Sequence, residues 1–128
     1  KKKANGLSHI NLITQNVDHN ELGNLFNSHK VHVLASFRES PGLSSLEALG
    51  SGMNVVVCES SYCPTKTYFN DLIGQHVFVC DPYSKKSIKK AMGNANIAKV
   101  PLENLIEKFN WLNTAKKTYD SYLSILNV

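Results

Sequence analysis

Two glutamates that stand eight positions apart, Glu39 and Glu47, are the residues of this chain best suited to chemistry. Glu39 precedes a Pro-Gly pair, and Glu47 lies in the short helical pattern that follows this pair. The N-terminus of a helix presents free N–H groups and the positive end of the helix dipole, and both suit a phosphate. A carboxylate one turn into that helix can accept hydrogen bonds from ribose hydroxyls, and one on the loop can accept them from a second sugar ring. The arrangement therefore predicts a site for a nucleoside diphosphate linked to a sugar.

The loop between the two acids adds backbone groups to this predicted site. Pro41 and Gly42 let the chain approach a ligand closely, and Leu43 and Ser44 would present their amide groups. Glu47 taken alone has a simpler interpretation, because an acid near the start of a helix often serves only the helix dipole or solubility. Its position in an apolar stretch with few other charges favours the functional interpretation.

A strand, a loop, a helix and a second strand are needed to position these residues. Residues 31–35 form an apolar run, 43–50 show a helical pattern that Gly50 and Gly52 close, and 54–59 begin with a second apolar run. This is the parallel crossover unit of α/β proteins, whose ligands bind beyond the carboxyl ends of the strands. The loop with Glu39 lies at that end of the first strand.

The whole chain predicts the order β-α-β-α-β-α-β-α-α-α, which indicates an α/β fold with a Rossmann-like parallel sheet and flanking helices. We expect residues 1–8 to be a flexible end and 9–128 to be part of one domain whose sheet is incomplete. We expect Tyr68, Phe69 and Leu72 to face inward and Trp111 to anchor the last helix. The strands are predicted at 9–14, 31–35, 54–59 and 77–80, and the helices at 18–30, 43–50, 65–72, 84–92, 102–109 and 114–126.

Composition excludes several classes of protein. The net charge of +4 is modest and the lysines are spread over helical patterns, so we expect a solvated face and no nucleic-acid partner. No apolar run approaches the length of a membrane span, and no apolar stretch follows Lys1–Lys3, so we expect no secretory leader. Three cysteines without a pairing framework fit a reducing compartment.

Other kinds of catalytic site find little support. The five histidines are scattered, no C-x-x-C occurs, and neither a Walker loop nor a G-x-S-x-G elbow is present. We therefore expect no metal. Cys58 and Cys80 lie in predicted buried strands, where packing is their ordinary role. Arg38 either forms an ion pair with Glu39 or orients it, and the residues leave both interpretations open.

The stretch from Glu39 to Gly52, with Gly42-Leu43 and Glu47-Ala48 inside it, resembles the Glu-x7-Glu motif of GT-B glycosyltransferases of the retaining family 4 type. Further likenesses cover about residues 9–126. They are Pro64 to Phe69, Cys80-Asp81-Pro82 with Ser87-Ile88, and Phe109-Asn110-Trp111 before the last helix. The chain departs from the family at Asn54, where a Pro is common, and at Thr67, where a Glu is common.

The resemblance implies most of the C-terminal, donor-binding domain of a GT-B enzyme that moves a hexose-type sugar, with retention, from a nucleotide-sugar to a glycan or lipid-linked acceptor. By likeness, Glu39 touches the donor sugar and is the catalytic candidate, and Glu47 holds the ribose. The donor-binding residues are then Glu39, Ser40, Pro41, Gly42, Leu43, Ser44 and Glu47. The family needs no metal or other cofactor. Relatives carry the Arg and Lys that pair with the diphosphate upstream of the first strand.

The partners implied are the nucleotide-sugar and an N-terminal acceptor domain of the same protein, which is absent from these residues. We therefore expect the 128 residues alone to bind donor weakly and to transfer no sugar. The family commonly builds surface polysaccharides, which implies a cytoplasmic location and leaves peripheral contact with the inner face of the membrane open. The alternative is a non-catalytic α/β module that binds a nucleotide or a partner. A receiver-like signalling domain has little support, because only Asp81 sits suitably at a strand end.

Overall fold

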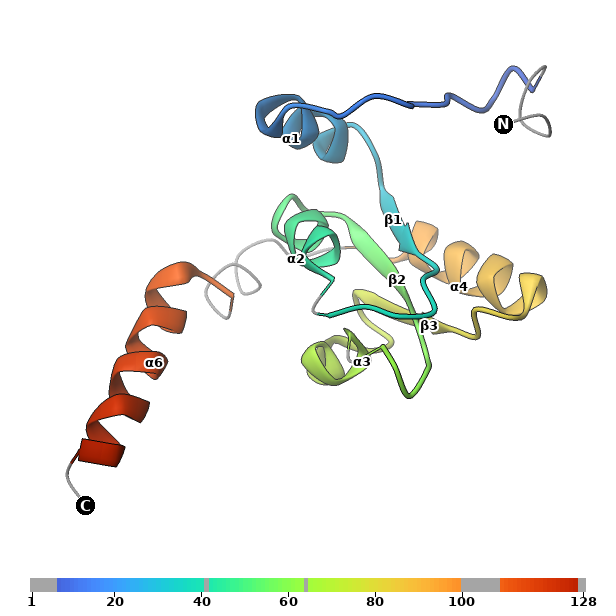
Figure 1. Cartoon of the computed structure of the whole chain (residues 1–128). Helices are drawn as coiled ribbons and strands as arrows, with labels where there is room; N and C mark the ends of the chain where they lie inside the picture. Colours follow the sequence, from blue (N-terminus) through green and yellow to red (C-terminus); the bar gives the residue numbers. More distant parts are fainter. Residues whose placement is uncertain (1–6, 41, 64, 100–108, 127–128) are drawn as a thin grey trace.

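The computed structural model describes residues 7–40, 42–63, 65–99 and 109–126. Three strands, β1 (Val31–Leu34), β2 (Asn54–Cys58) and β3 (Val77–Cys80), form a parallel sheet in the order β1-β2-β3. The described helices are α1 (His19–Asn27), α2 (Leu43–Gly50), α3 (Thr65–Tyr68), the 3-10 turn η1 (Asn70–Leu72), α4 (Lys85–Ile97) and α6 (Trp111–Leu126), as Figure 1 shows. The structure confirms the predicted α/β fold class, with a Rossmann-like parallel sheet and flanking helices.

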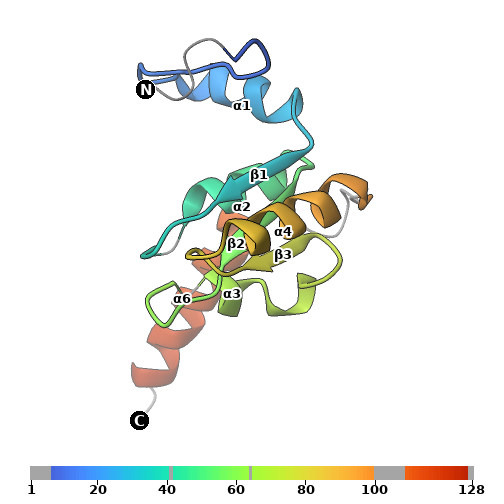
Figure 2. The same cartoon turned by 90° about the vertical axis from the view of Figure 1, so that its right-hand side faces the viewer.

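The two faces of β2 face two separate cores. Successive side chains of a strand point to opposite faces, so Val55 and Val57 pack with α2, and Val56 and Cys58 pack with α4. Figure 2 shows α4 in front of the sheet, with α2 behind it. Every residue of β2 is buried, as expected for a central strand covered on both faces. The run of valines suits this position, because branched side chains pack well on a pleated surface.

Residues close by in the sequence explain where α1 and α2 and the strands beside them begin and end. Asp18 caps α1, because its carboxylate accepts a hydrogen bond from the Asn20 amide at 2.9 Å. The helix predicted at 43–50 is confirmed residue for residue. Gly52 adopts the predicted left-handed conformation, with φ of 83°. The strands β1 and β2 each end one residue before the predicted boundary, and the predicted strand at 77–80 is confirmed as β3.

The prediction of a strand at residues 9–14 is wrong. Residues 9–14 form no strand and are exposed, with Ile10, Leu12 and Ile13 at 43%, 46% and 51%. The segment lies near α1 and away from β1 (Figure 1), so no neighbouring strand completes its backbone hydrogen bonds. An apolar run predicts burial, but a strand also requires a partner edge.

Two helix predictions in the middle of the chain need correction. The helix at 65–72 divides into α3 and η1, so that Phe69 is buried while Tyr68 is 47% exposed and does not face inward. The helix predicted to end at 92 continues to Ile97, where Ala95 packs against the sheet. The Asn54 amide Nδ2 donates to the carbonyls of Ala95 and Ala98, at 2.8 and 2.9 Å. This contact with β2 satisfies carbonyls at the end of α4.

The last helix, α6, begins at Trp111 rather than at 114 and buries none of its residues. Trp111 is 84% exposed, so its predicted role as a packing anchor is wrong. Figure 1 shows α6 extending away from the sheet. The helix predicted at 102–109 lies outside the described residues except for Phe109, whose ring meets that of Phe69 at 5.8 Å between centroids. None of the helices in the described residues is both long enough and apolar enough to cross a membrane.

Candidate functional site

Gly42 connects the loop after β1 to α2, and its conformation requires glycine. It is the N-cap of α2, with φ of 75° and ψ of 51°, in the left-handed region. A Cβ here would lie 3.0 Å from Thr65 Cγ2 and 3.4 Å from Leu34 Cδ2. The helix has no side-chain cap. The amide groups of Leu43 and Ser44 therefore open the helix without a capping side chain. Pro41 lies outside the described residues.

The loop before Gly42 is held by hydrogen bonds to the loop after β2. The Glu39 amide donates to the Tyr62 carbonyl at 3.2 Å, and Ser60 Oγ donates to the Phe37 carbonyl at 3.1 Å. The Tyr62 amide donates to Ser60 Oγ at 3.2 Å. These bonds place two loops side by side beyond the carboxyl ends of neighbouring strands, where parallel sheets bind ligands.

A cavity of about 410 Å³ opens between these loops, and we call it the Glu39 cavity. Glu39 is half-buried in this cavity. The guanidinium carbon of Arg38 lies 5.1 Å from the centre of the Tyr62 ring, within the range of a cation–π contact. Arg38 is therefore held by an aromatic ring of the neighbouring loop, a contact that neither of the two sequence interpretations included. The described residues that line the cavity are Arg38, Glu39, Ser40 and Tyr62.

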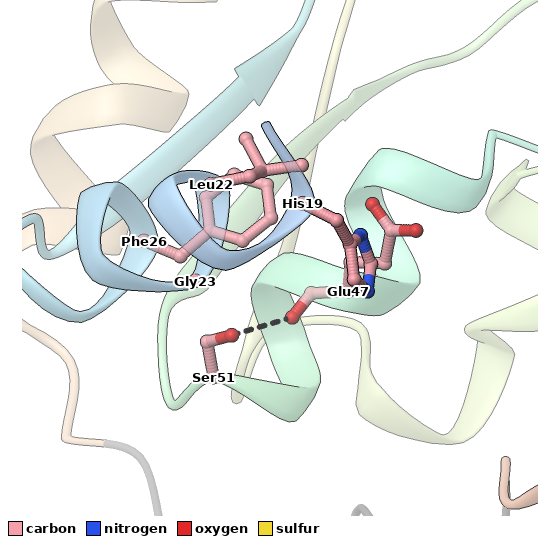
Figure 3. Close-up of a pocket in the computed structure, with 6 residues that line it drawn as sticks. All are labelled: His19, Leu22, Gly23, Phe26, Glu47 and Ser51. Carbon is pink, nitrogen blue, oxygen red and sulfur yellow. Dashed lines mark hydrogen bonds between the residues drawn. The ribbon is translucent and has the colours of Figure 1, made fainter. Parts of the chain in front are cut away.

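Glu47 lines a different cavity, of about 210 Å³, between α1 and α2, and we call it the Glu47 cavity. Ser45, Ala48 and Leu49 of α2 face the core, so the exposed Glu47 points away from it toward α1. Figure 3 shows the Glu47 carboxylate beside the imidazole of His19. The described residues that line this cavity are His19, Leu22, Gly23, Phe26, Glu47 and Ser51.

His32 contacts Phe26, one of the residues that line the Glu47 cavity. Its ring meets the edge of Phe26, with 5.9 Å between centroids. Its Nε2 atom is buried and has no hydrogen-bond partner among the described residues. Burial lowers the pKa of His32, and the negative charge of Glu47 acts in the opposite direction.

The three cysteines are buried, free thiols. Burial raises the pKa of the Cys58 thiol to about 12, and the nearby Cys80 contributes to this rise. Cys63 Sγ lies 2.7 Å from Thr65 Oγ1. These thiols fit the predicted packing role for Cys58 and Cys80, because nucleophilic cysteines have lowered pKa values. No group of three or more His, Cys, Asp or Glu side chains in the described part of the chain is arranged to hold a metal ion.

The structure brings some of the predicted site residues together and separates others. Glu39 and Ser40 share one cavity, and Glu47 lines the other. Leu43 and Ser44 come between the two acids in sequence and form the first turn of α2. Sequence reasoning missed Tyr62 and His19, because each comes from a segment far from the motif.

The parallel sheet, its helices on both faces and a cavity beside the loop that leads into a crossover helix define a Rossmann-like α/β protein. Residues 2–108 match the family model of glycosyl transferases group 1. The chain therefore belongs to this glycosyltransferase family. Comparisons with the curated proteins and with the solved structures gave no significant match.

Proposed function

We propose that this chain is the donor-binding domain of a retaining GT-B glycosyltransferase of the family 4 type. It would bind a nucleotide-sugar whose sugar is transferred to a glycan or lipid-linked acceptor held by a second domain. The observation that carries the proposal is the α2 N-terminus, where the left-handed Gly42 follows the loop that lines the Glu39 cavity. The Glu47 cavity lies farther along, between α1 and the second half of α2.

The Glu47 cavity suits the nucleoside end of the donor. Leu22 and Phe26 give it apolar walls, and Gly23 has no atom near the position where a Cβ would be. The Glu47 carboxylate accepts hydrogen bonds only, so it suits the two neighbouring hydroxyls of a ribose. Apolar walls with a few polar groups are the usual composition of a small-molecule site.

The Glu39 cavity suits the sugar end of the donor, and the start of α2 suits the diphosphate between the two ends. Glu39 would accept hydrogen bonds from sugar hydroxyls, and Ser40 adds a further polar group. The amides of Leu43 and Ser44 would bind the diphosphate at the positive end of the helix dipole. In this proposal backbone amides and basic side chains neutralise the diphosphate, so the site uses no metal.

Titration calorimetry of the 128-residue chain with UDP, GDP, ADP and their sugars tests the proposal. We expect weak, saturable binding of one nucleotide series. Glu47→Gln removes the charge at nearly constant size, and we expect it to weaken binding about ten- to hundred-fold, since a hydrogen bond to a charged group contributes about 1.5–3 kcal/mol.

Asp120→Asn is the matched control, because it removes one carboxylate from the exposed helix α6. Nucleotide affinity that is equal in Glu47→Gln, Asp120→Asn and the unmodified chain would contradict the proposed site. Binding of a partner protein without binding of any nucleotide would instead favour the non-catalytic module.

A further inference from the structure

Arg38 is the only arginine among the 128 residues. Its side chain is exposed and lines the Glu39 cavity together with Glu39 and Ser40. The chain uses lysine for every other basic position, and lysine and arginine differ in how they bind oxyanions. The position of this single guanidinium is therefore informative.

Contacts on both sides hold the loop that carries Arg38. Ser36 Oγ donates to the Arg38 carbonyl at 2.8 Å, and the Glu39 amide donates to the Tyr62 carbonyl at 3.2 Å. The ring of Phe37 lies 4.8 Å from the ring of Tyr83, between centroids. These contacts connect the loop after β1 to the loops after β2 and β3, so the backbone at Arg38 has neighbours that restrict its movement.

The contact with Tyr62 orients the guanidinium and leaves its hydrogen-bond donors usable. A guanidinium carries five N–H donors, and an attraction to the face of one ring does not use all of them. Among the described residues, the Arg38 side chain makes the ring contact and no ion pair with Glu39. The N–H groups of Arg38 are thus available to a ligand in the cavity.

A planar fork of N–H donors matches the oxygens of a phosphate, and such bonds are short and strong because both partners are charged. We propose that Arg38, oriented by Tyr62, binds the diphosphate of the donor from the Glu39 cavity. This inference rests on the proposed nucleotide-sugar site. The guanidinium would bind the diphosphate from the side of the loop while the amides at the start of α2 bind it from the helix.

The test compares ligands with and without phosphate. The affinities of UDP, GDP and ADP and of the matching nucleosides are measured by calorimetry for the unmodified chain and for Arg38→Ala, Arg38→Lys and Tyr62→Leu. We expect Arg38→Ala to weaken the diphosphate about ten- to hundred-fold and to leave the nucleoside unchanged. Arg38→Lys should recover part of the loss, since it restores the charge without the fork. Tyr62→Leu should cause a smaller loss for the diphosphate alone.

Lys117→Ala on the exposed helix α6 is the control for a general loss of positive charge. Equal affinity of Arg38→Ala and Lys117→Ala for the diphosphate would overturn the inference, as would an equal loss for diphosphate and nucleoside. Glu47→Gln separates this failure from that of the proposed function, because it should weaken both kinds of ligand. An unmodified chain that binds none of the nucleotides would overturn both proposals.

Discussion

Replacing Gly42 with alanine should destabilise the protein more than the same change at Gly74 or Gly93. The left-handed conformation of Gly42, with φ of 75°, disfavours a side chain by about 1–2 kcal/mol. The added Cβ would also lie 3.0 Å from Thr65 Cγ2. Thr65 is fully buried, so the methyl group has little room to move, and such overpacking costs about 1–3 kcal/mol. The expected loss in the free energy of unfolding is therefore about 2–5 kcal/mol.

Two matched substitutions separate the contributions. Gly74 has φ of 84° and no atom within 4 Å of the Cβ position, so Gly74→Ala should cost only the conformational part, about 1–2 kcal/mol. Gly93, inside α4, also has open space and carries no positive φ. Gly93→Ala should therefore stabilise the protein by about 0.5–1 kcal/mol.

Urea unfolding, followed by circular dichroism, measures these differences in the free energy of unfolding. The comparison requires that the slope of this free energy against urea concentration is the same in each variant. Nucleotide affinity measured beside it reports on the site, and it should fall in Gly42→Ala but not in Gly74→Ala. A loss of unfolding free energy in Gly42→Ala no larger than that in Gly74→Ala would show that the Thr65 side chain moves aside. This result would refute the reasoning from close packing. Stabilisation by Gly42→Ala would refute both parts.

Two further predictions follow from buried titratable groups. Burial lowers the pKa of His32 and His76 in the folded protein, so the unfolded chain binds more protons below the ordinary pKa of about 6.5. The free energy of unfolding should therefore be steady above that pH and fall as the pH decreases; an equal urea midpoint at about pH 7.5 and 5.5 would contradict this. Burial raises the pKa of Cys58 to about 12, so iodoacetamide at about pH 8 should modify this thiol in urea but not in the folded protein. Mass spectrometry measures the modification, and labelling of folded protein at the rate of a free thiol would contradict the prediction.

The unit from β1 to β2 could be predicted because its determinants are local. The apolar runs differ in period from the helix between them, and glycines mark both ends of that helix. The bounds of α2 and the left-handed Gly52 are confirmed for this reason. The motif also lies within residues 2–108, which match the family model.

Elements that depend on a distant partner were harder to predict. Residues 9–14 have the composition of a strand, but a strand requires a second strand beside it. Trp111 and Tyr68 are large and apolar, yet both are exposed, because burial depends on which surface lies opposite. The end of α4 depends on the Asn54 side chain of β2, which is far away in sequence.

In the candidate site, too, some features depend on neighbouring residues in the sequence and others on distant ones. Residue types and spacing determined the two acids, the glycine between them and the helix that separates them, because these are properties of one continuous segment. Only the tertiary structure decided that Glu39 and Glu47 line different cavities. It also decided that Tyr62 lines the cavity of Glu39 and that His19 lines the cavity of Glu47. The physical reason is that a cavity forms between elements, and its second wall comes from whichever loop or helix the sheet places opposite.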